Sequence, residues 1–333
     1  MTARAVAKGA IGRAAVARPL RRRTRAAFAD SVNVVYYHYI GEPRPYYADF
    51  YSGTTLERLD ADLSRLARWF AFAPLSEVVA GAGQPTAQPR LAVTFDDGFD
   101  LISTGALDVL ERHGVKATTF VMTGCVGNAS LMWRNKLSAV RALCGADACL
   151  RAYNRIAARY SIEPIAEADR LLAASARWPL QAKDDLADEL WRACDMPPLQ
   201  EFLDEHRPYL DWAALGEWIA RGHEVGHHTR THPYCARLDD DGVRTELAEP
   251  AALLRERLGL DWLALSYPFG SRLDAATERT LVEQGVVDCA LGIRGFAPVG
   301  TPSHRLERAS AEHHLDFEVF GRAALASLRR RQG

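Results

Sequence analysis

Hydrophobic positions along the chain follow two different periods, one typical of strands and the other of helices. Short runs rich in β-branched and aromatic residues predict strands at 31–37, 90–95, 116–122, 223–226, 262–267 and 286–291. Apolar residues at helical spacing predict helices at 56–70, 101–113, 211–221, 247–258, 275–284 and 317–330. Strands that alternate with helices form parallel β/α units, and their repetition along this chain indicates an α/β barrel.

The alternation of strands and helices stops between residues 130 and 208, where only helical patterns remain. We interpret 130–208 as a helical insertion beside the active-site rim, because loops on a β/α scaffold carry specificity. The alternative is that 130–208 has only a structural role and lies far from the site. Trp133, Trp178 and Trp191 fall in this region. They would suit a sugar-binding platform, but aromatic residues at helical spacing are more often core residues.

Charge divides the chain into a basic tail and a more acidic body. Residues 1–28 carry eight basic residues and no acidic one, and the chain has a formal net charge of −1, so the rest carries about −9. We assign 1–28 to a tail that is either disordered or laid on an anionic membrane surface. The barrel is assigned to 29–325, and a short basic end follows at 326–333.

The composition of the 333-residue chain, 48% hydrophobic and 25% charged, is that of a globular protein. No apolar run approaches the roughly 18–20 residues needed to span a bilayer, and the tail lacks the features of a secretory signal. The six cysteines form no Cys-x-x-Cys pair, so free thiols are expected. We therefore expect a cytoplasmic location and no nucleic-acid partner. A tail laid on the membrane would place the protein at the cytoplasmic face of the inner membrane through peripheral contact.

Two adjacent carboxylates, Asp96 and Asp97, follow the strand predicted at 90–95 directly. The carboxyl ends of the strands form the active-site face of a β/α barrel. Adjacent acids at a buried strand end repel each other, and a divalent cation would offset this repulsion. An Asp-Asp-Gly turn with solvated acids is the simpler interpretation of this segment on its own.

Histidines four residues apart, His228 and His232, follow the strand predicted at 223–226. This spacing places two rings on one face of a helical turn and is typical of zinc ligands. The neighbouring His223 and His227 are interpreted as packing residues, with an orienting role for a ligand as the alternative. A third strand end carries Ser266 to Gly270, a turn whose backbone N–H groups are able to stabilise an oxyanion.

Together these segments resemble the polysaccharide deacetylase family, also called the NodB-homology domain or carbohydrate esterase family 4. The resemblance is carried by Thr94-Phe95-Asp96-Asp97-Gly98, by Gly222 to Gly226 with His228-Thr229-Arg230-Thr231-His232-Pro233, and by Tyr267-Pro268-Phe269-Gly270. It implies a distorted (β/α)7 barrel that removes N-acetyl groups from N-acetylhexosamine units of a surface polysaccharide or glycan precursor.

The resemblance also implies a role for each matching residue. Asp96 is expected to be the general base, and Asp97, His228 and His232 are expected to bind a divalent metal. Zinc is the expected ion, with cobalt or manganese as alternatives. The backbone N–H of Phe269 is expected to complete an oxyanion hole.

Two departures from the family pattern affect the proton-transfer groups. The family often has an arginine that orients the base two residues before the proline of the third segment, and Ser266 occupies that position here. The C-terminal histidine motif has no clear match among His304, His313 and His314. One subgroup, the exopolysaccharide poly-N-acetylglucosamine deacetylases, has a histidine at the end of its N-terminal strand, as His38 does here. We therefore predict that His38 is the general acid.

Two other functions compete with this hypothesis. A catalytically inactive barrel would only bind glycan, but it would not require Asp96, Asp97, His228 and His232 together. A metal-dependent hydrolase of another small amide would reuse the same barrel, and fold alone does not distinguish it.

Overall fold

The computed structural model describes residues 7–8, 11, 14, 18–312, 315–323 and 325. Most of the basic tail before residue 18, the basic end at 326–333, and His313 and His314 lie outside these residues. No helix of the described part is both long enough and apolar enough to cross a membrane.

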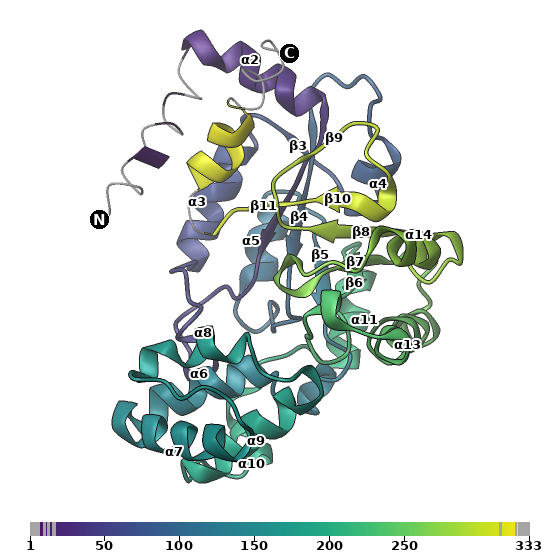
Figure 1. Cartoon of the computed structure of the whole chain (residues 1–333). Helices are drawn as coiled ribbons and strands as arrows, with labels where there is room; N and C mark the ends of the chain where they lie inside the picture. The colour runs from purple at the N-terminus through teal and green to yellow at the C-terminus, as the bar shows by residue number, and fades with distance from the viewer. Residues whose placement is uncertain are drawn as a thin grey trace.

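Parallel strands form a curved sheet at the centre of the molecule (Figure 1). Its long run comprises β2 (Val34–Tyr37), β4 (Arg90–Phe95), β5 (Thr118–Val121), β6 (Glu224–His227), β7 (Ala264–Ser266) and β8 (Cys289–Gly292). Neighbouring strands in this run are β8-β7-β6-β5-β4-β2, and all of the pairs are parallel. Five of the six residues of β4 are buried, as expected for a strand covered on both faces.

The two edges of the sheet are joined by a single short segment, which we call the seam and define as residues 306–310. It consists of β10 (Leu306–Glu307), Arg308 and β11 (Ala309–Ser310). Strand β10 pairs with β8 at one edge, and β11 pairs with β2 at the other. The seam therefore acts as a split seventh strand, and the predicted distorted (β/α)7 barrel is confirmed.

Helices surround the sheet. They are α2 (Arg18–Ala29), α3 (Leu56–Leu66), α4 (Leu75–Ala80), α5 (Ala106–Arg112), α11 (Trp212–Ala220), α12 (Asp240–Val243), α13 (Glu249–Leu258) and α14 (Ala275–Glu283). Minor strands β1 (Ser31–Val32) and β9 (Ala297–Pro298) form an antiparallel pair, and β3 (Ala71–Phe72) pairs with β4. Helix α11 begins at an N-cap, because the carboxylate of Asp211 accepts a hydrogen bond from the backbone N–H of Ala214 at 2.8 Å.

Several predicted boundaries differ from those of the structure. Residues 101–105 form turns, so the helix expected at 101–113 is limited to α5. A π-helical segment, Arg244–Ala248, precedes α13 and places Pro250 in the first turn of α13, where proline is tolerated. Residues 18–28, which were assigned to the tail, form most of α2, and Phe28 packs against Trp69 and Phe70.

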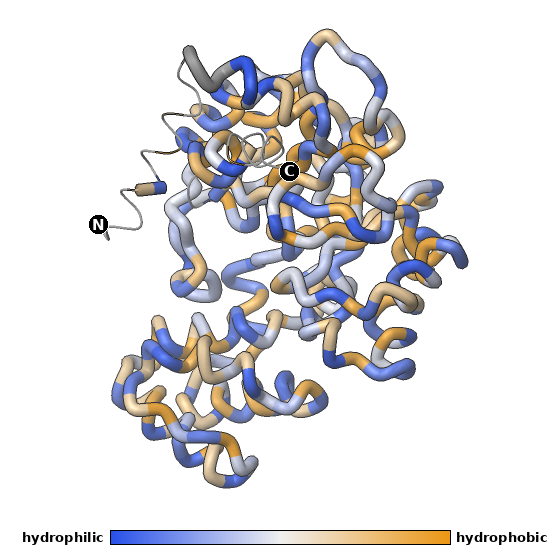
Figure 2. The backbone as a smooth tube through the Cα atoms, turned by 45° about the horizontal axis from the view of Figure 1, so that its top comes forward, coloured by the Kyte–Doolittle hydropathy of each residue, from blue (hydrophilic) through white to orange (hydrophobic). Residues whose placement is uncertain are grey.

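The insertion forms a helical lobe with its own hydrophobic core. Its helices are α6 (Trp133–Cys144), α7 (Ala146–Arg159), α8 (Leu171–Ser175), α9 (Lys183–Ala193) and α10 (Leu199–His206). These helices lie together apart from the strands (Figure 1), and each mixes hydrophobic and polar residues (Figure 2). Trp133, Trp178 and Trp191 are buried in this second core, so they are core residues rather than an exposed sugar platform.

Residues from loops at the carboxyl ends of the barrel strands complete the core of the insertion. Tyr47 follows β2, Phe99 follows β4 and Met122 follows β5, and all three are buried with the insertion residues. The insertion is therefore docked on the end of the barrel where the candidate site lies.

Candidate active site

A cavity of about 360 Å³ opens at the carboxyl ends of the strands. All six residues singled out from the sequence line it, although they come from four separate loops. The lining comprises Tyr36, His38, Tyr47, Asp49, Phe50, Asp96, Asp97, Met132, Arg134, His228, His232, Tyr267, Phe269, Ile293 and Glu312.

The strand register explains how distant residues come together. Tyr37 is paired with Phe95 across β2 and β4, so His38 and Asp96 leave the sheet side by side. His227 is paired with Leu265 across β6 and β7, which places His228 beside Ser266. In a parallel sheet every such exit is at the same end of the barrel.

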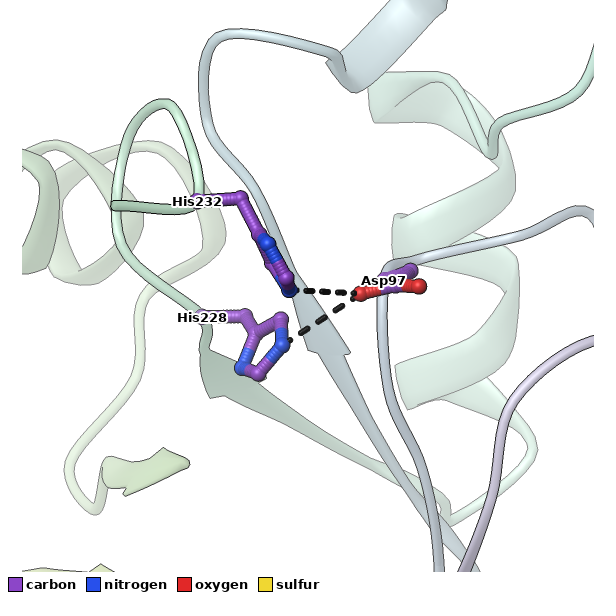
Figure 3. A group of neighbouring side chains, drawn as sticks. All are labelled: Asp97, His228 and His232. Atoms are coloured by element: carbon purple, nitrogen blue, oxygen red, sulfur yellow. Dashed lines mark ion pairs between the residues drawn. The ribbon is translucent and has the colours of Figure 1, made fainter. Parts of the chain in front are cut away.

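Asp97, His228 and His232 turn their side chains toward one another (Figure 3). The Asp97 Oδ1 atom lies 3.3 Å from Nε2 of His228 and 3.3 Å from Nε2 of His232. All three residues are buried. Four residues other than glycine have positive backbone φ angles at these loops and the adjacent turn, namely Asp97, Thr229, His232 and Phe269. Such angles are costly for residues other than glycine and persist where the surrounding structure imposes them, often at functional sites.

The two histidines are oriented by different means. The ring of His228 is fixed by a 2.8 Å hydrogen bond between Nδ1 and the carbonyl oxygen of Ser266, which leaves Nε2 to face Asp97. The backbone of His232 is held instead. Its N–H donates to Thr229 Oγ1 at 3.0 Å, and its carbonyl accepts from the indole N–H of Trp133 at 3.0 Å. Helix α6 of the insertion therefore helps to position His232.

The loop between the two histidines is also tied down by Glu246 and Lys183. The Glu246 carboxylate accepts the backbone N–H groups of Arg230 at 3.0 Å and Thr231 at 2.8 Å. The Lys183 ammonium, from helix α9, donates to the Thr231 hydroxyl at 2.8 Å. Two helices of the insertion thus contact the loop that carries both histidines.

These three residues fit a divalent metal. Their ligand atoms all lie within 4.8 Å of one another, and Asp97 Oδ1 is buried without a hydrogen-bond partner. Ligands bound at about 2.0–2.1 Å to a tetrahedral zinc lie roughly 3.3 Å apart, which agrees with the two distances from Asp97. Burial outweighs the nearby Asp97 and lowers the pKa of His232 to about 4, so the imidazole is neutral, as a ligand must be.

Asp96 faces the same cavity but has a different partner. The Arg308 guanidinium binds both of its carboxylate oxygens, at 2.7 and 2.8 Å, and also donates to Ser266 Oγ at 2.6 Å and Thr94 Oγ1 at 3.1 Å. Arg308 is completely buried. Burial is the largest influence and would raise the pKa of Asp96, but the charge and hydrogen bonds of Arg308, together with His228 and His38, outweigh it and hold that pKa below the ordinary value. Asp96 is therefore ionised.

His38 is paired with Glu312 on the opposite wall. Its Nδ1 lies 2.9 Å from Glu312 Oε2, and its backbone N–H donates to Oε1 at 2.7 Å. Burial would lower the pKa of His38, but the charge and hydrogen bond of Glu312 outweigh it, with help from Asp97 and Asp96, and raise that pKa to about 10. His38 therefore carries a proton at neutral pH.

A family model described as polysaccharide deacetylase matches residues 83–286, which include the two aspartates, both histidines of the candidate metal site and Phe269. This chain belongs to the polysaccharide deacetylase family. It is accordingly an enzyme that deacetylates a glycan, with an acetylated carbohydrate as its substrate. Deacetylases of this family are metal-dependent, in keeping with the Asp-His-His set.

Solved structures share the fold of this deacetylase at low sequence identity. The deacetylase PplD from Streptococcus pyogenes, in complex with acetate, has a TM-score of 0.55 and 16% identity, covering 86% of this chain and 98% of that chain. IcaB from Ammonifex degensii has a TM-score of 0.52 and 17% identity, covering 87% and 97%. A gellan lyase from Bacillus sp is 40% identical over 78 residues, which are 23% of this chain and only 3% of that protein.

Phe269 lies in the turn Pro268–Gly270, beside the metal-binding residues of the deacetylase. Its ring stacks on Tyr234 with centroids 4.3 Å apart and meets His232 edge-on at 4.5 Å. The ring contacts, together with a φ of 58°, fix the backbone of this residue at the cavity wall.

Two residues that partner the proton-transfer groups were missed by sequence reasoning. Arg308 provides the guanidinium that Ser266 does not, and Glu312 is the partner of His38. The one available signal for Arg308 was the serine at position 266, where the family often has an arginine. An ionised, buried aspartate requires a cation, so another basic residue had to take that place. No comparable signal marked Glu312.

The remaining histidines near the metal-binding loop do not line the cavity. His223 Nδ1 accepts the backbone N–H of Ala117 at 3.0 Å, and its ring lies 4.2 Å from that of Trp218. These contacts match the packing role expected from the sequence. His227 is completely buried at the end of β6.

Proposed function

We propose that this deacetylase is a zinc-dependent hydrolase of N-acetylhexosamine units in a surface polysaccharide or glycan precursor. The observation that supports this most directly is the content of a single cavity. It contains a buried Asp-His-His set, an ionised aspartate and a protonated histidine. Amide hydrolysis needs a water activator, a base and an acid, and these three groups correspond to them.

Zinc held by Asp97, His228 and His232 would polarise the acetamide carbonyl and make its water more acidic. One carboxylate oxygen and two imidazole nitrogens form a ligand set that suits zinc and would leave the ion accessible to water or substrate. Cobalt and manganese are the alternatives to be tested.

Asp96 is proposed to take the proton from the attacking water. Arg308 keeps it ionised, and the two hydrogen bonds to both carboxylate oxygens fix the plane of the carboxylate. A base that is already oriented needs little reorganisation during the reaction. The same pairing makes Asp96 a weaker base, so we expect its orientation to matter more than its basicity.

His38 is proposed to donate its proton to the nitrogen of the leaving amine. Glu312 accepts from Nδ1, so Nε2 of the ring remains available to the substrate. The backbone N–H of Phe269 is proposed to stabilise the oxyanion that forms when water adds to the carbonyl.

The test combines metal analysis with acetate release from N-acetylglucosamine oligomers. We expect about one zinc per wild-type chain, and loss of both metal and activity in His232→Ala and Asp97→Ala. His304→Ala serves as a control, because this histidine lies outside the cavity. A wild-type chain that binds no divalent metal after reloading would contradict the proposal.

A further inference from the structure

Arg134 projects from the first turn of α6 into the active-site cavity. Its guanidinium carbon lies 4.9 Å from the ring centroid of Phe50, 4.9 Å from that of Phe269 and 5.8 Å from that of Trp133. A cation over an aromatic face is attracted by the negative charge of the ring face. The side chain is therefore held in place, although it is long and flexible in solution.

The Arg134 guanidinium has no acidic partner among the described residues. No hydrogen bond or ion pair joins it to them, and its Nε atom is buried without a hydrogen-bond partner. Aromatic rings stabilise a cation only partly, because their faces do not satisfy N–H donors. The donors of this group are thus left for a molecule that enters the cavity.

The acids that line the cavity are each engaged by a group other than Arg134. Asp49 accepts from the Arg141 guanidinium at 2.7 Å, Asp96 is bound by Arg308, and Glu312 is bound to His38. Asp97 belongs to the metal-binding set. Because each of these four acids has another partner, no acid that lines the cavity is paired with Arg134.

We propose that Arg134 binds an anionic substituent, a carboxylate or a phosphate ester, on the glycan that this enzyme deacetylates. The proposal rests on the proposed function of the site and adds a substrate class to it. A guanidinium presents parallel N–H donors that match either group in a bidentate arrangement. Because the aromatic contacts already order the side chain, little conformational entropy is lost on binding.

The charge of the product supports the same substrate class. Deacetylation leaves an ammonium group on the sugar, and a uniform polymer of amino sugars would place further positive charge beside Arg134. Like charges repel in a cavity of low dielectric constant. A glycan with acidic substituents would avoid this repulsion and would remain bound through successive reactions.

The test compares three oligosaccharides of equal length. They are a neutral N-acetylglucosamine oligomer, an alternating N-acetylglucosamine–glucuronate oligomer, and a neutral oligomer phosphorylated at its reducing end. We expect the wild type to have a higher kcat/KM for one of the acidic substrates. In Arg134→Met the ratio of acidic to neutral kcat/KM should fall about 10- to 100-fold, as expected for a charge-assisted pair.

Two further variants separate recognition from structure. Arg134→Lys keeps the charge but lacks the planar fork, so it should recover only part of the ratio. Arg151→Met removes an exposed arginine of α7 and should leave the ratio unchanged. Preference for the glucuronate oligomer would identify a carboxylate, and preference for the phosphorylated one a phosphate. An equal loss on all three substrates in Arg134→Met would overturn the proposal.

Binding measured by calorimetry gives an answer even where acetate release fails. If the wild type deacetylated none of the three, the proposed function would be contradicted for these sugars. The Arg134 proposal would then stand or fall on whether the acidic oligomers bind at least tenfold more weakly to Arg134→Met than to the wild type.

Discussion

The two sides of the active site are assembled in different ways. The metal side comprises Asp97, His228 and His232. Both histidines come from one short loop after β6, and the spacing of the two histidines is visible in the sequence. The proton-transfer side, which comprises Asp96 and His38 with their partners, pairs residues far apart in the chain. The sequence separation is 212 for Asp96 and Arg308 and 274 for His38 and Glu312. A local motif can therefore specify ligands, but the groups that set the charge of the base and the acid depend on closure of the barrel.

Among the substitutions that distinguish the two sides, replacing Arg308 should cause the largest losses of stability and kcat. Arg308→Met leaves Asp96 buried without its cation, which costs about 3–5 kcal/mol of stability and should lower kcat about 10²- to 10⁴-fold. The metal ligands do not contact Arg308, so the metal content of the folded fraction should be unchanged. Calorimetry, metal analysis and steady-state kinetics together test this separation.

A double variant sharpens the Arg308 test. Arg308→Ser combined with Ser266→Arg moves the guanidinium to the position where the family often has it, beside the same Asp96 carboxylate. We expect at least tenfold recovery of kcat over Arg308→Ser alone. Full activity in Arg308→Met would show that the proton-transfer side does not depend on the seam.

Replacing His38 or Glu312 should affect acid catalysis next most strongly. His38→Asn should lower kcat about 100-fold or more, and a mild decrease would rule out its role as the acid. Glu312→Gln removes the charge that raises the pKa of His38 to about 10. Because the protonated ring is the active form, the alkaline limb of the pH–rate profile should move to lower pH by at least about one unit.

A smaller effect, on zinc affinity, is expected from the contact between Trp133 of the insertion and His232. Trp133→Phe keeps the ring but removes the hydrogen bond to the His232 carbonyl, which is worth about 1 kcal/mol. Zinc affinity should fall roughly 3- to 10-fold, as measured by competition with a chelator. Trp191→Phe is the matched control, because this indole donates within the insertion, to the Pro197 carbonyl. Equal affinities in both variants would show that the insertion does not support the metal side.

The last expectation concerns stability alone, with no effect on catalysis, and it follows from the burial of His223. Burial, assisted by the charge of Lys116, lowers the pKa of His223 to about 4 from an ordinary 6.5. Below pH 6.5 the unfolded chain binds a proton that the folded chain does not. The stability from this group is therefore complete above pH 6.5 and is lost as the pH falls toward 4, by at most about 1.4 kcal/mol per pH unit.

Urea unfolding of His223→Asn at several pH values tests this expectation. Its stability should decline less steeply than that of the wild type between pH 6.5 and 4, whereas His304→Asn should follow the wild type. Parallel curves for His223→Asn and the wild type would contradict it.

The sequence was sufficient to predict the elements whose signals are local. The strand at 90–95 was predicted with the bounds that β4 has, because a continuous apolar run ends there in two acids. The insertion was predicted from a change of period alone, and its helices pack around their own core. His228 and His232 were singled out from their spacing and Asp97 from its place at a strand end. The family resemblance implied that the three act together, and the structure brings them together.

The partners of these residues could not be predicted for a physical reason. The strands of the seam are two residues long, too short to show any period, so nothing in the sequence marks Arg308 as a residue inside the barrel. Glu312 and Arg134 are single charged residues in segments that also carry ordinary surface charges. Only tertiary structure shows that the first has a partner in the cavity and the second has none.

The seam also determines when a newly made chain becomes catalytically competent. Asp97, His228 and His232 all precede the seam, so the metal-binding set is complete before residues 306–310 have been synthesised. Asp96 lacks its counter-charge until Arg308 docks between the two edges of the sheet. Closure of the ring and orientation of the base by its counter-charge are thus a single event, so we expect a chain with an open ring to lack a fixed base.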